Sequence, residues 1–324
     1  MSDQSLWVDT LRSVVAASAP LVLAGIGETL NERAGVINLS LDGSILLTAM
    51  TGFAVASLTG SLLVGFGAAM LVGALVALLI AYASMALKLD QVAVGFVLTL
   101  LGADLSSFLG RPFVGQPGPS VPHLAIPGLV DLPIVGRILF DHDLLVYFSL
   151  VSIVVAWLWI SKTQAGLKLR AVGERPAAAF ARGINVNRLR YLYTLAGGAL
   201  VGLAGAAYSL DVKLGWSHRH TSGLGWIALA IVIFGGWNPF RVAFGAYLFA
   251  ALKSLGSILQ PTMPQVPTQV FQATPFALMI LVLLLVSGDL DRLLFYLPPR
   301  LRPLVGSLLR GSPPAGLGRR FEQG

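Results

Sequence analysis

Charged side chains inside long apolar stretches are the residues of this sequence with the greatest potential for chemistry. Lys253 lies near the middle of the apolar stretch 240–260, and Asp104 lies in the last third of the stretch 91–110. Burying such groups in a membrane is costly, so they usually serve a purpose. Two explanations stay open: contact with a solute in a pathway, or a structural ion pair between Lys253 and an acid.

A second polar group surrounds a break between two apolar stretches. Glu28 lies near the end of the first stretch, Asn38 lies in the break, and Asp42 directly precedes the next stretch. Backbone groups that are freed at such a break are tolerated where they line a cavity. These side chains are therefore candidates for a solute pathway or gate, and capping of the helix ends is the alternative.

A third polar group brackets the short apolar stretch 224–237, which is about 14 residues long where a full crossing needs about 20. We expect a half-helix or re-entrant segment here, covered by protein or by a water-filled cavity. Trp226, Trp237 and Asn238 lie in or beside it. The tryptophans either anchor the chain at the membrane interface or form a gate that stacks on a ring of the solute.

Enzymatic chemistry finds no support in the sequence. The chain has no cysteine, which excludes disulfides, thiol catalysis and cysteine-bound metals. His218 and His220 are close in sequence, but two imidazoles without neighbouring carboxylates are a poor metal site. A Gly-x-x-x-x-Gly-Lys-Ser/Thr phosphate loop is missing as well. We expect no enzyme activity, no metal and no cofactor bound by this chain.

The elements that position these residues follow from the composition. Of the 324 residues, 56% are hydrophobic and 11% charged, with a mean hydropathy of +0.79, whereas soluble domains carry roughly 25% charged residues. No charged residue occurs in the 45 positions between Asp42 and Lys88, or in the 35 between Lys253 and Asp289. The chain is therefore expected to be a polytopic membrane protein. A soluble enzyme and a nucleic-acid partner are excluded, despite the net charge of +7.

The expected fold is all-α, in one integral-membrane domain over residues 1–324 with about nine transmembrane or partly re-entrant helices. Nine apolar segments indicate this number. Their approximate ranges are 12–30, 43–59, 61–86, 91–110, 144–160, 191–210, 224–237, 240–260 and 270–287.

The loops predict the orientation in the membrane, because cytoplasmic loops are rich in lysine and arginine. The loop 161–190 and the tail 288–324 are basic, so both are expected to be cytoplasmic. The Pro/Gly-rich stretch 111–143 is expected to be an extracytoplasmic loop. Counting crossings then places the N-terminus outside and Arg33 on the side of the basic loop.

Within the basic loop, the sequence predicts a short amphipathic helix. Glu174-Arg175-Pro176 is suited to open it, because proline is tolerated in a first turn and an acid favours the positive end of the helix dipole. Alanines continue the helix, and Gly183 is a plausible end. Such a rigid, basic helix is suited to a soluble partner, and anchoring by lipid headgroups is the alternative.

The same loop resembles the coupling-helix segment of permease subunits from ATP-binding-cassette importers. The signature of that segment is an acid, paired alanines and a glycine a few residues on, which Glu174, Ala178, Ala179 and Gly183 match. The continuation Gly-Ile-Asn-Val is typical of the branched-chain amino acid, ribose and nucleoside class.

Two further segments resemble the same family. Residues 27–43 are similar to the segment between the first helices of nucleoside and simple-sugar members, with Asp42 where glutamate is more usual. Residues 225–239 are the third match, and the three together extend the resemblance over nearly the whole chain. Lys253 departs from the family pattern, which is apolar or neutral in that helix.

The resemblance implies a permease subunit that forms the pathway for a nucleoside or simple sugar in a bacterial inner membrane. It implies four kinds of partner besides the lipid bilayer. These are two cytoplasmic ATPase subunits that carry ATP and Mg²⁺, a second identical or homologous permease, and an extracytoplasmic solute-binding protein. The alternative is an ion-coupled secondary transporter, which needs carboxylates inside its helices and usually an internal repeat. Asp104 is one such carboxylate, and no convincing repeat is found.

Overall fold

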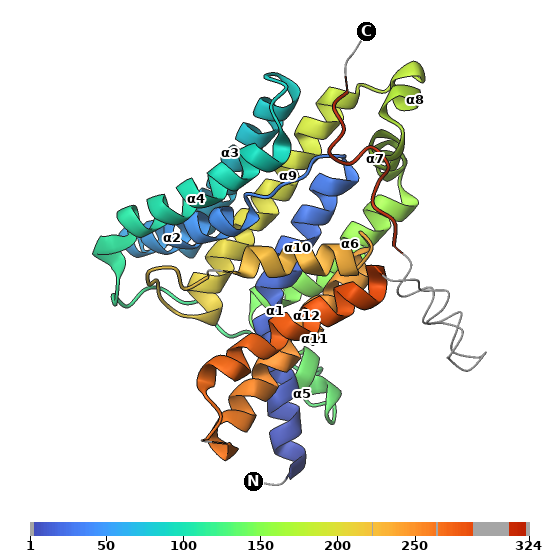
Figure 1. The fold of residues 1–324 in the computed structure, drawn as a ribbon. Coiled ribbons are helices and arrows are strands. Elements are labelled where there is room, and N and C mark those ends of the chain that lie inside the picture. The colour runs from blue at the N-terminus through green and yellow to red at the C-terminus, as the bar shows by residue number, and fades with distance from the viewer. Residues whose placement is uncertain (1–2, 222, 264, 288–310, 322–324) are drawn as a thin grey trace, which may run out of the picture.

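The computed structural model describes residues 3–221, 223–263, 265–287 and 311–321, and in these the chain is all-α, with no strand (Figure 1). Arg292, Arg300, Arg302 and Arg310 of the expected basic tail lie outside the described residues. The helices are α1 (Asp3–Arg33), α2 (Leu41–Thr59), α3 (Leu62–Met85), α4 (Gln91–Gly110), α5 (Val135–Leu139), α6 (Leu144–Lys162), α7 (Gln164–Glu174), α8 (Pro176–Ala181), α9 (Val186–Ala207), α10 (Leu224–Phe234), α11 (Pro239–Leu259) and α12 (Thr268–Ser287).

The expected polytopic membrane protein is confirmed. Within the described residues, seven helices are long and apolar enough to cross a membrane: α1, α2, α3, α4, α6, α11, and α9 with the π-helical turn Tyr208–Val212 that extends it. Each of the nine predicted apolar segments coincides with a helix. The number of complete crossings stays a prediction.

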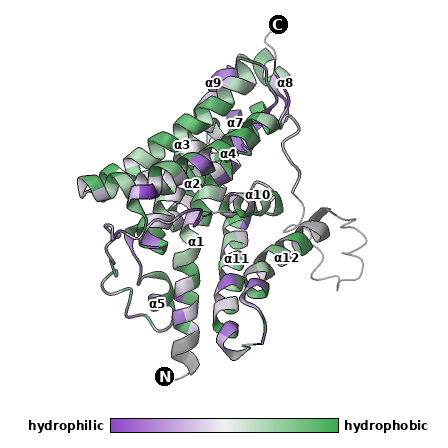
Figure 2. Ribbon diagram, turned by 60° about the vertical axis from the view of Figure 1, so that its left-hand side comes forward, coloured by the Kyte–Doolittle hydropathy of each residue, from purple (hydrophilic) through white to green (hydrophobic). Residues whose placement is uncertain are grey.

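The core is built around α1, α2 and α9. The first two are mostly buried, whereas α3 and α4 expose most of their apolar residues, as expected of helices that face lipid. The hydropathy colouring of Figure 2 shows α3 as largely hydrophobic. Glycines on α9 allow the backbones to touch: a Cβ at Gly202 would lie 2.2 Å from the carbonyl oxygen of Ala69 on α3. Small residues at helix contacts are a common basis of packing in membranes.

The short helix α10 coincides with the apolar segment expected to be a half-helix or re-entrant, and whether it crosses the membrane stays a prediction. It has 11 residues and runs across the middle of the molecule, at a large angle to α1 (Figure 1). Its residues Leu224, Ile227 and Ile231 are buried in the main core. Protein therefore covers most of this helix, as the environment of a membrane requires for an interrupted segment.

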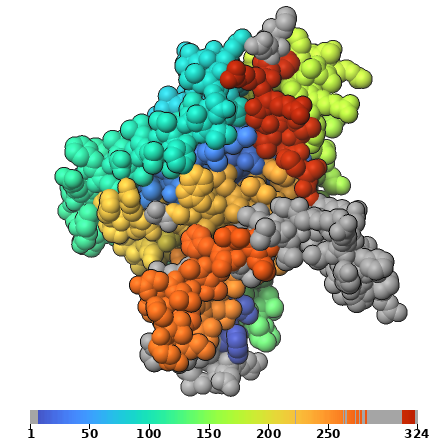
Figure 3. Space-filling view, viewed as in Figure 1, coloured from blue at the N-terminus to red at the C-terminus, as the bar shows by residue number. Residues whose placement is uncertain are grey.

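One end of the molecule carries α7 and α8 and is called the α8 end; the opposite end carries the N-terminus (Figure 1). Arg33 lies at the α8 end, where a Cβ on Gly173 would be 2.1 Å from its carbonyl oxygen. Residues 311–321 also lie on this end, beside α8 (Figure 3). The placement of Arg33 agrees with the predicted order of crossings.

The helix boundary in the basic loop differs from the expected one. Glu174 is the last residue of α7, and α8 begins at Pro176. Proline disfavours the helical conformation of the residue before it, and Arg175 accordingly has φ −141° and ψ 78°. Glu174 therefore ends one helix rather than opening the next.

Candidate functional site: a polar junction, a cavity and an exposed helix

The break between α1 and α2 is organised by the buried carboxylate of Glu28. Its Oε2 accepts a hydrogen bond from the side-chain amide of Asn31 at 2.9 Å, and its Oε1 accepts one from the backbone amide of Asn38 at 3.3 Å. Asn38 in turn accepts a bond from the hydroxyl of Ser40 at 2.7 Å. Glu28 and Asn38, singled out separately from the sequence, therefore meet and fix the path of residues 34–40.

Asp42 links the start of α2 to the start of α10. Its Oδ1 accepts hydrogen bonds from the backbone amides of Gly223 and Gly225, at 2.8 and 3.0 Å. The two helix ends touch, because a Cβ at Gly225 would lie 2.2 Å from the Cα atom of Asp42. A carboxylate at this place satisfies amides that the first turn leaves free and favours the positive end of the helix dipole. The contact that Asp42 makes is thus helix-end capping, and a contact with solute stays a prediction.

The other end of α10 is held by Trp237, which is only 4% exposed. Its indole nitrogen donates a hydrogen bond to Glu32, and its carbonyl oxygen accepts bonds from the guanidinium of Arg33 at 3.1 and 3.2 Å. Trp237 is therefore enclosed in the protein. Asn238 caps α11 through the amide of Phe240, whereas Trp226 is 39% exposed.

Lys253 borders two adjoining cavities of about 320 and 350 Å³. Lys213 lies on the same walls, near enough for the two ammonium groups to repel each other. Aromatic side chains make up much of the remaining wall: Tyr208, Phe249, Phe271 and Phe276. Leu224, the first residue of α10, lines both cavities. The described lining residues include no acid, so Lys253 faces open space rather than a buried ion-pair partner.

Asp104 does not pair with Lys253. Its Oδ1 lies 3.3 Å from Nη2 of Arg219, and both side chains are more than half exposed. An exposed pair of this kind contributes little to stability. Asp104 therefore pairs with Arg219 and is not the acid of the ion pair that the sequence left open for Lys253.

The helix α8 is exposed on one face and packed on the other. Ala178 is exposed and Phe180 is 42% exposed, whereas Ala179 is 4% exposed and belongs to a small core with Val172 and Val186. Gly183 ends the helix with φ +80°, and its amide donates to the carbonyl of Phe180 at 2.8 Å. The paired alanines thus differ in their surroundings, since one faces outward and the other holds the helix in place.

Comparison with known proteins identifies the family. The model of the branched-chain amino acid transport system/permease component family matches residues 10–283. The chain belongs to this permease family. Similar curated proteins include a putative glucose ABC transporter permease protein of Haloferax volcanii, 38% identical over 76% of each chain. A guanosine ABC transporter permease protein of Bacillus subtilis is 34% identical over 85% of this chain and 90% of its own.

A nucleoside ABC transporter permease protein of Lactococcus lactis is also 34% identical, over 87% of this chain and 94% of its own. No solved structure matches the permease. The match to the family model, over residues 10–283, includes the polar junction, the residues that line the cavities, and α8. The resemblance that three sequence segments indicate is therefore confirmed for the permease family.

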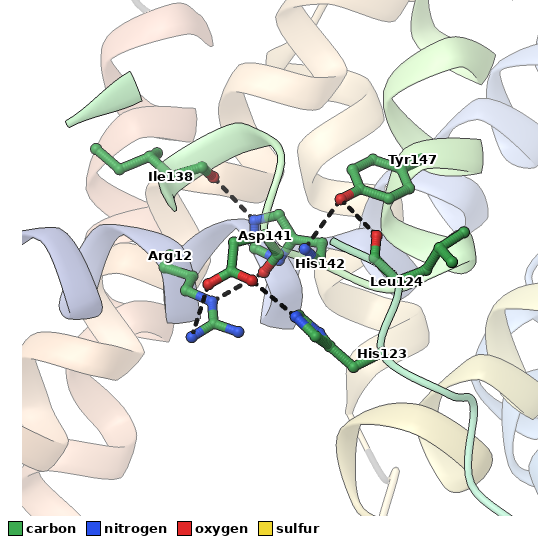
Figure 4. A network of polar contacts seen from close by, with 7 residues as sticks. All are labelled: Arg12, His123, Leu124, Ile138, Asp141, His142 and Tyr147. Atoms are coloured by element: carbon green, nitrogen blue, oxygen red, sulfur yellow. Dashed lines mark hydrogen bonds and ion pairs between the residues drawn. The ribbon is translucent and has the colours of Figure 1, made fainter. Parts of the chain in front are cut away.

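At its N-terminal end, the permease holds residues 111–143 in place through a polar network (Figure 4). Asp141 pairs with Arg12 of α1 at 3.3 Å and with His123 at 2.7 Å. The ring of His142 donates a hydrogen bond to the carbonyl of Ile138 at 2.8 Å. Burial lowers the pKa of His142 below its usual 6.5, and the charge of Arg12 lowers it further. This loop is thus anchored to the first helix.

In the described part of the permease, no group of three or more possible metal ligands includes His218 or His220. The ring of His220 instead contacts the carbonyl of Ser217 at 2.9 Å and the hydroxyl of Ser209 at 3.2 Å. Burial lowers the pKa of His220.

Three buried or cavity-lining residues of the permease are absent from the site that the sequence predicts: Glu32, Arg190 and Lys213. Glu32 follows Glu28 by four positions, which places both carboxyls on one face of α1; that spacing is a usable signal. Arg190 lies in the predicted basic loop, yet it is 1% exposed. Its burial depends on residues 311–321, which are more than a hundred positions away in sequence.

Proposed function

We propose that the permease forms the translocation pathway for a nucleoside or simple sugar in an ATP-driven importer. The names of its relatives support both solute classes, since two are called guanosine or nucleoside permeases and one a putative glucose permease. The second of the three matching segments, residues 27–43, favours the nucleoside and simple-sugar branch. A nucleoside is the first choice, because the cavity has aromatic walls on which a base can stack.

The observation that carries the proposal is the position of α10. This helix begins in the interior, with its first turn capped by Asp42 and its first residue, Leu224, on the wall of the cavity. Interrupted membrane helices whose ends open on a cavity are typical of transport pathways. Lys253, Lys213 and Tyr208 would then contact the solute, and Glu28, Asn38, Trp237 and Asn238 would hold the helix ends that move as the pathway opens.

The proposed importer includes the remaining partners. Two cytoplasmic ATPase subunits would bind ATP and Mg²⁺ and act on α8, since the permease itself lacks a phosphate loop. A second permease, identical or homologous, would complete the pathway, and a solute-binding protein would deliver cargo on the outside. The complex would lie in a bacterial inner membrane, with α8 in the cytoplasm. Rigid-body motion of α8 and its neighbours would alternate access to the pathway.

Uptake measurements test the solute. Bacterial cells that produce the complete transporter should take up labelled guanosine, and excess unlabelled nucleosides should compete with it more strongly than glucose or pentoses do. Competition by glucose alone would move the assignment to the sugar class. Uptake that persists without the ATPase and follows a sodium or proton gradient would favour the ion-coupled alternative.

A further inference from the structure

We propose that the C-terminal residues 311–321, here called the C-terminal strap, form part of the surface that docks the ATPase and hold α8 in position for it. This inference rests on the proposed function, because it takes an ATPase as the partner at α8. The strap crosses the α8 end on the outside of the bundle (Figure 3). Three kinds of contact and one feature of the surface support the inference.

The first contacts join the strap to the backbone of the bundle. The amide of Gly316 donates to the carbonyl of Gly173 at 2.7 Å, and that of Gly318 donates to the carbonyl of Gly35 at 3.1 Å. The strap therefore binds α7 and the junction after α1 together. A Cβ at Gly316 would lie 2.7 Å from the oxygen of Gly173 and 3.1 Å from Cδ of Pro176, so this close approach requires glycine.

The second contact uses a buried cation. Arg190 of α9 is 1% exposed, and its Nη1 donates a hydrogen bond to the carbonyl of Arg319 at 3.0 Å. Its Nε and Nη2 have no hydrogen-bond partner in the part of the chain that the structure describes. A buried guanidinium that loses a partner destabilises its surroundings. Arg190 therefore favours the bound position of the strap.

The third contacts hold α8 itself. The ring of Phe321 packs against that of Phe180 with 5.6 Å between centroids, and it also borders the small core of Ala179, Val172 and Val186. A helix of six residues is too short to be stable through its own hydrogen bonds. The orientation of α8 depends on such packing, and Phe321 is thus a positioning residue for α8.

The fourth feature is the surface that the two segments share. On this end Arg175, Arg182, Arg319 and Arg320 are exposed, against the single exposed acid Glu174 among the described residues of these segments. The half-exposed Phe180 lies among them. A partner that fits this surface presents acidic side chains around an apolar groove. Because Glu174 also accepts a hydrogen bond from the amide of Ala315 at 3.2 Å, α7, α8 and the strap form one continuous face.

Cysteine labelling tests the docking directly, because the native chain has no cysteine. The variants Arg320→Cys on the strap and Gln116→Cys in the loop after α4 are each labelled with a maleimide, in the assembled permease with and without its ATPase. We expect the ATPase to slow labelling at position 320 about tenfold, since interface cores exclude water, and to leave position 116 unchanged. Equal labelling with and without ATPase would overturn the docking role. Slower labelling caused by anionic lipid vesicles, and not by ATPase, would also overturn it.

The positioning role is tested with Phe321→Ala in the complete transporter, with Phe148→Ala, a half-exposed phenylalanine of α6, as the matched control. Loss of the ring contact should weaken ATPase binding about fivefold, and it should raise the ratio of ATP hydrolysed to solute imported. The amount and thermal stability of the permease should stay close to those of the control. A wild-type ratio and wild-type binding would overturn the role of Phe321. If the unaltered chain neither binds an ATPase nor imports solute with ATP, the proposed function itself has failed.

Discussion

A hydrogen bond between Trp237 and Glu32 connects two interruptions of the helices, one after α1 and one between α10 and α11. The indole nitrogen of Trp237, in the turn between α10 and α11, donates a hydrogen bond to the carboxyl of Glu32 in the last turns of α1, although 205 positions separate them. Both residues are buried. The end of α1, where the chain enters the polar junction, is thereby fixed to the turn where α10 stops.

Removal of this hydrogen bond should destabilise the permease. In Trp237→Phe, a buried carboxyl loses its donor, which should lower the free energy of unfolding by about 1–3 kcal/mol. Thermal unfolding of the purified permease in detergent measures the change. Trp226→Phe is the control, because Trp226 is 39% exposed and should change little. Equal stability of the two variants would show that the Glu32 contact is unimportant.

The cap on α10 predicts a graded response at Asp42. Asp42→Ala removes the acceptor for the amides of Gly223 and Gly225 and should cost about 1–2 kcal/mol of stability, with reduced uptake. Asp42→Asn keeps an acceptor oxygen and should retain most of both properties. Asp104→Ala serves as control, since its side chain is 76% exposed. If Asp42→Ala keeps full stability but loses uptake, the residue contacts solute instead of capping the helix.

The two neighbouring alanines of α8 should respond differently to a charge. Ala179→Glu places a carboxylate in the small core with Val172 and Val186 and should displace α8, so that transport is uncoupled from ATP hydrolysis while membrane insertion continues. Ala178→Glu lies on the exposed face, where it should weaken only the contact with the partner. Uptake, ATP hydrolysis and insertion are measured for both. Full transport by Ala179→Glu would show that α8 takes no part in coupling transport to ATP hydrolysis.

A substitution of Lys253 tests whether the cavities form part of the transport pathway. Because Lys253 borders open space beside Lys213, Lys253→Leu should impair uptake without lowering the thermal stability of the permease. Ser257→Ala, on the same walls, is the conservative control. Normal uptake by Lys253→Leu, combined with a higher unfolding temperature, would identify the lysine as a dispensable charge and the cavity as unrelated to transport.

The loop 111–143 should loosen in acid. Burial lowers the pKa of His142, so the native loop resists a proton that the unfolded loop accepts near 6.5. Its stability is therefore complete above this pH and falls as the pH drops below it. Hydrogen exchange of residues 122–142 at about pH 8 and about pH 5 measures the effect. His142→Gln keeps a donor for the carbonyl of Ile138 and should remove most of the pH dependence of hydrogen exchange. A pH dependence that persists in this variant would show that a group other than His142 causes it.

The sequence predicts the helices well because their signal is local. A span needs only a long run of apolar residues, so each of the nine predicted segments coincides with a helix, including the short α10. Polar side chains such as Glu28 and Asp42 are likewise identified by their unusual surroundings. The sequence alone leaves two roles open for them, contact with solute or capping of helix ends, because both roles use the same residue types.

The partners of these residues are beyond sequence reasoning, since they come from distant parts of the chain. Asp42 caps a helix 183 positions away, and Arg190 meets the carbonyl of Arg319 after 129 positions. The π-helical turn at Tyr208 has no sequence signal that separates it from the α-helix before it. The expectation that Glu174 opens a helix is wrong, because Glu174 ends α7 and the next helix begins only at Pro176.

We propose that the permease is a passive pathway that an ATPase drives from one end. The most direct test of this proposal is uptake into proteoliposomes that contain the permease with its ATPase and solute-binding protein, compared with the permease alone. Accumulation of labelled nucleoside against a gradient should require both the ATPase and ATP, and the permease alone should accumulate none. Accumulation by the permease alone, driven by a proton or sodium gradient, would contradict the account.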